Sequence, residues 1–409
     1  MRPSSAGQFL AADRLALKHD GHRLLTLSIF HCVNDGSLAL FASALPVMRV
    51  SLALSLVEIG TVLSLGLVAT MVLQPLFGCL SDRGHARRIL LLGFAGIVIL
   101  DLAFPVGSSF LQVLVLYVLL RSAAGVYHPV GFSSIGRTYA ENKTAAFGYQ
   151  GATGDLGLAI ATFSTGILSQ AWGWRIPFWA WGTVGIILFT YFAATIARYR
   201  IDFHQQSSIL TSESKSTAGN KSPRSAFATV ATVSCITTAT FILFTGYMPL
   251  YFNIAEQFSP GESATMVTLW IGVGALAGFG AGRLVKVLGG EVRTLKLMFT
   301  IEAMLFLIAN IPPPHMLSLS VWPMVRCVAI VATGLPVFVT FPAINGLLGL
   351  RMPHRRLGMT YALNLSLGLM VSSLATYFTG YAASMMTIGV MLPVLLVVAV
   401  VGAIACLML

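Results

Sequence analysis

The stretch GCLSDRGHARR, residues 78–88, is a short basic connection between two long apolar runs. The runs on either side cover residues 55–80 and 89–106; the first exceeds and the second approaches the roughly 20 residues that an α-helix needs to cross a lipid bilayer. Because lipid offers the backbone no hydrogen-bonding partner, such runs must be helical. The stretch therefore predicts two membrane helices joined by a loop on one side of the membrane.

The same alternation of apolar runs and short polar connections continues along the whole chain. Of its 409 residues, 56% are hydrophobic and only 10% are charged, which excludes a soluble globular domain of this length. Membrane-spanning strands are also excluded, because the runs are too long and too continuous. We expect twelve transmembrane helices, at residues 24–48, 55–80, 89–106, 110–135, 145–170, 176–197, 227–252, 263–283, 293–311, 317–342, 356–380 and 384–408.

Basic residues are sorted by side along this alternation. The connections on one side carry nearly all of the 25 Lys and Arg residues, whereas those on the other side carry Arg49 and Arg175. Basic loops stay in the cytoplasm during membrane insertion. The pattern predicts a multi-pass protein of the inner (plasma) membrane with cytoplasmic N- and C-termini. The net charge of +11 then reflects topology within the lipid bilayer, and we expect no nucleic-acid partner.

One long polar stretch divides the apolar runs into two groups of six. Residues 199–225 are rich in Ser, Thr, Lys and Gly, a composition typical of a flexible linker. Sequence patterns also recur about 205–210 positions apart, and such parallel repeats indicate two related bundles around a central cavity. We predict an N-terminal six-helix bundle with a cytoplasmic arm at 1–198, a cytoplasmic linker at 199–225 and a C-terminal six-helix bundle at 226–409, related by pseudo-two-fold symmetry.

The loop after the second apolar run carries a motif that resembles a family signature. Four residues match the signature between helices two and three of the major facilitator superfamily: Gly78, Asp82, Arg83 and Arg87. His85 departs from it, because a second glycine is usual there. The resemblance implies the major facilitator fold, a small-molecule substrate and a monomer, and it implies that this motif acts as a cytoplasmic gate.

A narrower resemblance is to the fosmidomycin-resistance group of efflux carriers. HCVND (31–35), QP (74–75) and YHP (127–129) are similar to short motifs of that group in helices one, two and four. The resemblance implies outward transport. It does not extend to drug specificity, because Arg121 and Asp155 match no position of the group.

Ionisable side chains within the apolar runs are candidate site residues, because each costs about 2.5–3.5 kcal/mol at the bilayer centre. At about 1.5 Å per residue, Asp35 lies about 17 Å into the first helix, close to mid-membrane. His31 precedes it by four residues and shares its helix face, so the two form a candidate proton site. The alternative is that Asp35 and Asn34 only hydrogen-bond neighbouring helices.

Four further ionisable residues are candidates for the cavity. Arg121, Asp155 and Arg326 are expected at similar depths, and opposite charges predict an Asp35–Arg121 interaction, direct or through water. The alternative is a structural pair of Arg121 with Asp155. A guanidinium fork fits carboxylate or phosphate, so two arginines facing one cavity favour an anionic substrate. His128 belongs either to a pocket or gate or to the hydrogen-bonded cytoplasmic end of its helix.

Glycines recur every third residue at the start of the fifth apolar run, at Gly148, Gly151, Gly154 and Gly157. Small residues let helices approach closely, so we predict a tightly packed or sliding helix face. A small-residue face of the eighth run is its candidate partner: Gly274, Gly278 and Gly282.

Motifs of other function classes are missing from the sequence. It contains no phosphate-binding loop, no HExxH and no Gly-x-Ser-x-Gly, so we expect neither an ATP-driven pump nor an enzyme, and no cofactor or metal site. The leading hypothesis is a secondary transporter that works by alternating access, as a proton-coupled antiporter exporting a small amphipathic or anionic compound. The alternatives are an importer or facilitator of a metabolite, such as an organic acid or sugar, and a membrane sensor that transports nothing.

Overall fold

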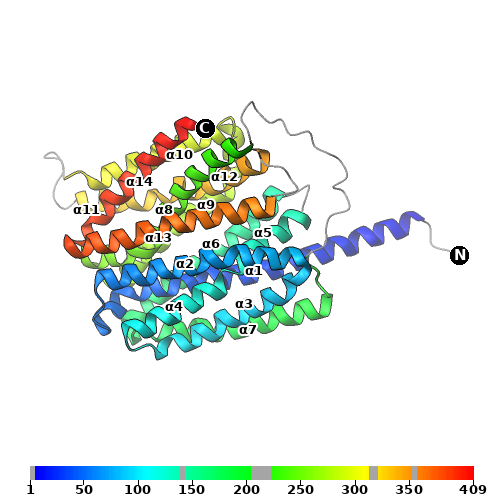
Figure 1. Cartoon of the computed structure of the whole chain (residues 1–409), viewed down its shortest axis with the longest axis horizontal. Helices are drawn as coiled ribbons and strands as arrows, with labels where there is room; N and C mark the ends of the chain where they lie inside the picture. The colour runs from blue at the N-terminus through cyan, green and yellow to red at the C-terminus, as the bar shows by residue number, and fades with distance from the viewer. Residues whose placement is uncertain (1–4, 139–142, 204–222, 313–320, 352–356) are drawn as a thin grey trace.

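The computed structural model describes residues 5–138, 143–203, 223–312, 321–351 and 357–409 (Figure 1). These residues form fourteen α-helices with no strand among them, which confirms the predicted all-α fold class. Nine described segments are long and apolar enough to cross a membrane, and some of them contain two helices. The chain is therefore an integral, multi-pass membrane protein.

The helices fall into two groups on either side of the predicted linker, most of which lies outside the described residues. In Figure 1 the first seven, blue to green, form the lower part of the molecule, and the last seven, green to red, form the upper part. The first group is α1 (Ser5–Ser51), α2 (Leu56–Leu80), α3 (Ala86–Ala103), α4 (Phe110–Ala124), α5 (Tyr127–Thr138), α6 (Lys143–Trp172) and α7 (Ile176–Tyr199). The second is α8 (Pro223–Ile254), α9 (Pro260–Val287), α10 (Glu291–Asn310), α11 (Trp322–Ala332), α12 (Gly334–Arg351), α13 (Leu357–Met385) and α14 (Met391–Ala405).

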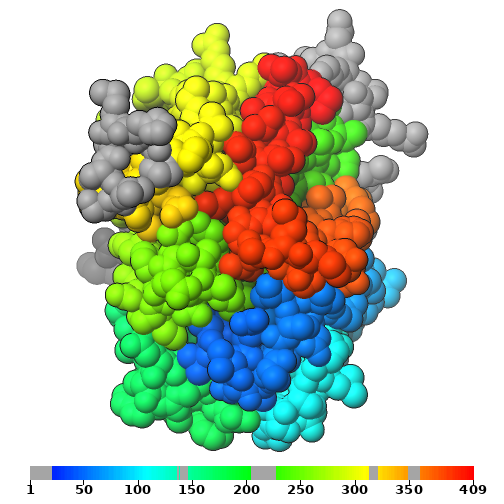
Figure 2. All heavy atoms as spheres, turned by 90° about the vertical axis from the view of Figure 1, so that its left-hand side faces the viewer, coloured from blue at the N-terminus to red at the C-terminus, as the bar shows by residue number. Residues whose placement is uncertain are grey.

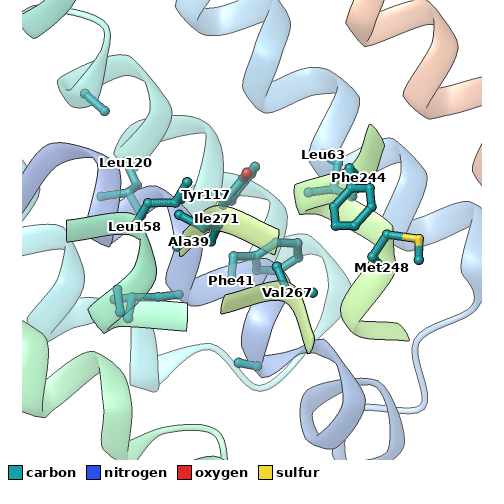
Figure 3. Close-up of a cluster of buried hydrophobic side chains, with 14 of the residues drawn as sticks. Ala39, Phe41, Leu63, Tyr117, Leu120, Leu158, Phe244, Met248, Val267 and Ile271 are labelled. Atoms are coloured by element: carbon teal, nitrogen blue, oxygen red, sulfur yellow. The ribbon is translucent and has the colours of Figure 1, made fainter. Parts of the chain in front are cut away.

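The two groups pack against each other mainly through α2 with α13 and α6 with α9. Buried apolar side chains from both groups form one core, including Phe41 and Leu63 from the first and Phe244 from the second (Figure 3). A Cβ atom on Gly60 would lie 3.1 Å from the Cα of Gly380, so the backbones of α2 and α13 approach closely. Figure 2 shows the two groups in contact at the end of the molecule away from the N-terminus.

The quoted stretch 78–88 forms a tight turn between α2 and α3. A kinked turn over Ser81–His85 joins the two helices. Gly84 has a φ of 86° there, in the left-handed region that glycine adopts without strain. The turn therefore depends on a glycine one position before the place at which the sequence signature expects it.

Two helices that were expected to be continuous are broken. The expected span 110–135 is divided between α4 and α5 at Gly125, and the span 317–342 between α11 and α12 at Thr333. Pro129 lies four residues after Gly125, and Pro336 lies four residues after Ala332. A proline has no N–H to donate to the carbonyl four residues earlier, which interrupts the helical ladder at each place.

Candidate functional site

The candidate site lies beside the close contact between α1 and α6. A Cβ atom on Gly154 would overlap the His31 ring, and one on Gly157 would overlap the backbone of Cys32. Gly148 and Gly151 have no such neighbours within 4 Å. The predicted glycine face is thus used over half its length, and its partner is α1.

The small-residue face of α9 packs elsewhere. Cβ atoms on Gly274 and Gly278 would meet Phe338 of α12. The expectation that this face is the partner of the α6 glycines is wrong, because the Phe338 ring lies against Gly274, and the Phe338 backbone and Cβ lie against Gly278.

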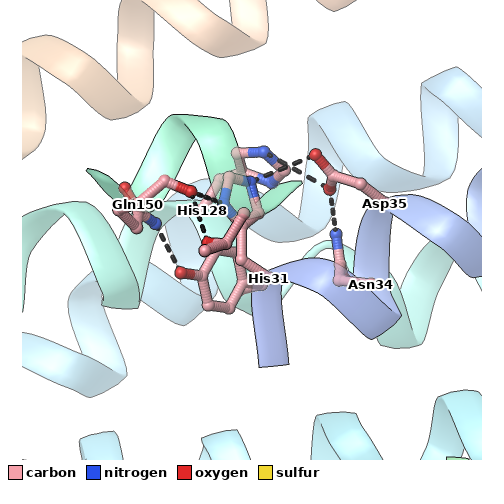
Figure 4. A network of polar contacts seen from close by, with 7 residues as sticks. His31, Asn34, Asp35, His128 and Gln150 are labelled. Carbon is pink, nitrogen blue, oxygen red and sulfur yellow. Dashed lines mark hydrogen bonds and ion pairs between the residues drawn. The ribbon is translucent and has the colours of Figure 1, made fainter. Parts of the chain in front are cut away.

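Asp35 is the centre of a polar cluster drawn from α1 and α5 (Figure 4). Its Oδ2 lies 3.1 Å from Nε2 of His31, and its Oδ1 lies 3.9 Å from Nε2 of His128. The side-chain amide of Asn34 donates to the same Oδ1 at 2.9 Å. The structure therefore brings four of the predicted site residues together around one carboxylate.

The His31 ring is held in place from the other side by α6. Its Nδ1 lies 2.8 Å from the backbone carbonyl oxygen of Gln150, and the ring stacks on Tyr127 at 4.6 Å between centroids. The side-chain amide of Gln150 donates to the Tyr127 hydroxyl. Sequence reasoning missed Gln150, because a backbone carbonyl has no residue-type signal. In the sequence, only the amide side chain of Gln150 pointed to this position.

The carbonyl contact determines which ring nitrogen of His31 carries a hydrogen. A carbonyl oxygen only accepts hydrogen bonds, so Nδ1 must be the N–H donor. In a neutral imidazole, Nε2 then has a lone pair, and it faces a carboxylate oxygen that also only accepts. Something positive must lie between His31 and Asp35: a proton or another cation.

The same cluster has the composition of a metal-binding set. One ligand atom each from His31, Asp35 and His128 lie within 4.8 Å of one another. The sequence-based expectation of no metal site overlooked this, because His128 is distant from the other two in sequence and reaches them only through the break before α5.

Arg121 lies near the cluster, on the last turn of α4, but pairs with neither candidate carboxylate. Its side chain is 6% exposed, and within the described part of the chain it forms no ion pair and its Nε has no hydrogen-bond partner. The predicted direct Asp35–Arg121 pair is not formed, because two histidines and an amide surround Asp35. The alternative pair with Asp155 is not formed either; Asp155 lies within electrostatic range of His31, which attracts it, and of Asp35, which repels it.

Arg326 does not join this cluster but pairs with a carboxylate of its own half. Its Nη2 donates to Glu256 at 3.1 Å, and the same carboxylate accepts from the Tyr251 hydroxyl at 2.6 Å. Arg121 precedes its helix break by four residues, whereas Arg326 precedes its own by seven. One extra helical turn moves Arg326 towards the connection after α8, where Glu256 lies. No sequence signal had singled out Glu256.

The predicted gate residues lie at the α2–α3 turn. Arg83, Arg87 and Asp82 are exposed there. A hollow next to this turn lies between the two groups of helices and is lined by Pro75, Gly78, Cys79, Asp82, Pro129, Ser133 and Ala362. The signature thus borders a seam between α2, α5 and α13.

Comparisons with known proteins agree with this architecture. A profile of the Major Facilitator Superfamily matches residues 27–376. No curated protein matches the sequence. The fold is similar to that of a bacterial homologue of the human lysosomal transporter Spinster in an inward-facing and occupied conformation, with TM-score 0.69 and 14% identity over 95% of this chain and 96% of that one. It is also similar to a mutant form of the nucleoside transporter NupG, with TM-score 0.70 and 12% identity over 94% of this chain and 99% of that one. Identities this low show the fold alone, whereas the profile spans most of the sequence, and the chain therefore belongs to the Major Facilitator Superfamily.

Proposed function

We propose that this secondary transporter is a proton-coupled antiporter that exports a small amphipathic or anionic compound by alternating access. The observation that carries the proposal is the contact of His31 with Asp35. Because Nδ1 of His31 donates to the Gln150 carbonyl, a hydrogen bond across the 3.1 Å gap to Asp35 requires a second, shared proton. A proton held between two side chains inside a membrane protein is suited to release when access to the site changes sides.

Arg121 supports an anionic group on the substrate. Its buried guanidinium has no carboxylate partner among the described residues, and an uncompensated buried charge is costly unless a ligand neutralises it. A carboxylate or phosphate group would accept two parallel hydrogen bonds from the guanidinium fork. In this proposal the linker at 199–225 and both termini lie in the cytoplasm, and the protein resides in the inner membrane.

The proposed gate is the α2–α3 turn. Asp82 lies on a seam between α2, α5 and α13, so a rocking motion of one bundle against the other would open or close the neighbouring hollow. On α6, Gly148 and Gly151 leave open space into which a neighbouring helix can move. We take the monomer as the working unit.

The test is proton flux in proteoliposomes that contain an internal pH dye, with wild type beside Asp35→Asn. Phosphonates, organic acids, sugars and lipophilic drugs are added in turn. We expect a substrate-triggered pH change that Asp35→Asn abolishes, because an amide cannot carry the proton. Glu262→Gln is the matched control, since it neutralises an exposed carboxylate in the first turn of α9 and should keep the flux.

Full active transport by Asp35→Asn would refute the proton site. Labelled ligands that cross without any pH change would instead favour the second candidate, an importer or facilitator of a metabolite, for which the likeness to a nucleoside transporter is the supporting observation. Ligand binding without any crossing would favour a membrane sensor.

A further inference from the structure

We propose that His31, Asp35 and His128 form a binding site for a divalent transition-metal ion of the class of Zn²⁺, Co²⁺ or Ni²⁺. The inference uses side chains of the proposed coupling site, but a metal ion can bind there whether or not the site couples transport to protons.

The spacing of the donor atoms fits such an ion. With bonds of about 2.0–2.2 Å, the ligand atoms of a tetrahedral ion lie about 3.3 Å apart. The separation is 3.1 Å from His31 Nε2 to Oδ2 of Asp35 and 3.9 Å from His128 Nε2 to Oδ1, the other oxygen of the same carboxylate. All three ligand atoms lie within 4.8 Å of one another, so a small rotation of the His128 side chain would complete the set.

The surrounding hydrogen bonds are those that a metal site requires. Metal-ligating histidines donate their second ring N–H to a carbonyl or carboxylate, which leaves the other nitrogen free to bind the ion. His31 does so to the Gln150 carbonyl, and its free Nε2 points at Asp35 (Figure 4). Asn34 in turn holds the Asp35 carboxylate. The lone pairs of His31 and Asp35 therefore converge on one point.

The ligand set selects the class of ion. Two imidazoles with one carboxylate suit first-row transition metals, whereas Mg²⁺ and Ca²⁺ prefer oxygen ligands alone. The side chains of Asp35 and His128 are 22% and 24% exposed. Three protein ligands with one open side leave at least one coordination position for water or for a donor atom of a transported compound.

The test is metal binding to the purified full-length protein in detergent. Zn²⁺ is titrated by calorimetry and Co²⁺ by its visible absorption bands, which report the coordination geometry. We expect one bound ion per chain. His128→Ala and Asp35→Asn should each weaken binding at least about tenfold, the lower end of the loss from disturbing even an outer-shell partner, and should remove the Co²⁺ bands.

Two control variants separate this site from other donors. His22→Phe keeps a ring to stack on Tyr199 and removes a histidine outside the cluster, and Cys32→Ala removes the nearest thiol in sequence. Both should bind the ions as wild type does, and Mg²⁺ should not compete. Absence of saturable Zn²⁺ and Co²⁺ binding would overturn the proposal, as would unchanged binding by His128→Ala and Asp35→Asn with wild-type melting temperatures. Metal binding that leaves proton flux unaffected would support the metal site and count against the proton role of Asp35.

Discussion

The two broken helices of the molecule share a backbone design but differ in their charges. The α4–α5 pair and the α11–α12 pair each break just before a proline, at Gly125 and Thr333. The arginine before the first break is buried with no ion-pair partner among the described residues, whereas the arginine before the second is paired with Glu256. The two breaks therefore share their helix geometry but not their electrostatics.

The same difference appears where the first helix of each half packs on a later one. In the N-terminal half, His31 on α1 meets Gln150 and Gly154 of α6. At the corresponding α8–α13 contact, Asn364 donates to the Ser234 hydroxyl at 2.8 Å. At this contact the N-terminal half has an ionisable side chain, whereas the matching contact of the other half has neutral hydroxyl and amide groups.

The largest expected effect comes from exchanging the two arginines for alanine. Arg121→Ala should lower the affinity for an anionic substrate roughly 10- to 100-fold, because a hydrogen bond to a charged group contributes about 1.5–3 kcal/mol. Arg326→Ala should leave that affinity near wild type. The measurement is binding of anionic and neutral ligands from the transport panel to each purified variant.

Equal losses of anionic and neutral ligands in Arg121→Ala would show a structural role and remove the contrast between the arginines. Arg326→Ala should instead reduce stability, because Glu256, which is 7% exposed, loses its partner. Adding Glu256→Gln to that variant should restore part of the melting temperature.

The membrane fold could be predicted from the sequence, whereas the arrangement of the site could not. The length of each apolar run and the charge of each connection are properties of single segments, so the membrane helices could be predicted without knowledge of tertiary contacts. The His31–Asp35 pair was also readable, because both residues share one helix face. The contact with His128 depends on the helix break at Gly125. That break can be predicted from the sequence only if Pro129 is interpreted as a helix breaker.

The pairing of Arg326 with Glu256 was missed for a related reason. A repeat offset of about 205 aligns Arg326 with Arg121, but the breaks at Gly125 and Thr333 set the true register of the two helices. A difference of three residues is nearly one helical turn, which is enough to place Arg326 beside Glu256. Sequence spacing alone does not resolve one turn.

A smaller effect tests the helix packing in the two halves. Gly157→Ala should destabilise the protein by about 1–3 kcal/mol, because its Cβ would overlap the Cys32 backbone and α1 would have to shift. Gly368→Ala should cost less, because its Cβ would meet the Thr238 side chain, with Oγ1 at 2.8 Å, and that side chain can adjust. The measurement is the midpoint of denaturant-induced unfolding in detergent.

Gly151→Ala is the matched control on the same helix as Gly157. No atom lies within 4 Å of the position of its Cβ, and alanine is favoured over glycine in a helix by about 0.5–1 kcal/mol. Its stability should equal or exceed that of wild type. If Gly151→Ala lost as much stability as Gly157→Ala, the glycines of α6 would not be explained by the close α1–α6 contact.

The smallest expected effect concerns the hydroxyl groups at the two breaks. Thr333 accepts the Trp270 indole N–H at 3.0 Å, so Thr333→Val leaves a buried donor without a partner and should cost about 1 kcal/mol. Thr70 donates to the Arg121 carbonyl at 3.0 Å, but that oxygen also accepts the Gly125 N–H at 3.1 Å. Thr70→Val should therefore cost at most about half as much, since the net contribution of a hydrogen bond is smallest when its acceptor keeps another partner. The unfolding midpoints of the two valine variants give the comparison directly. A larger loss of stability for Thr70→Val would show that the first break, beside Arg121, depends more on its hydroxyl group than the second break does.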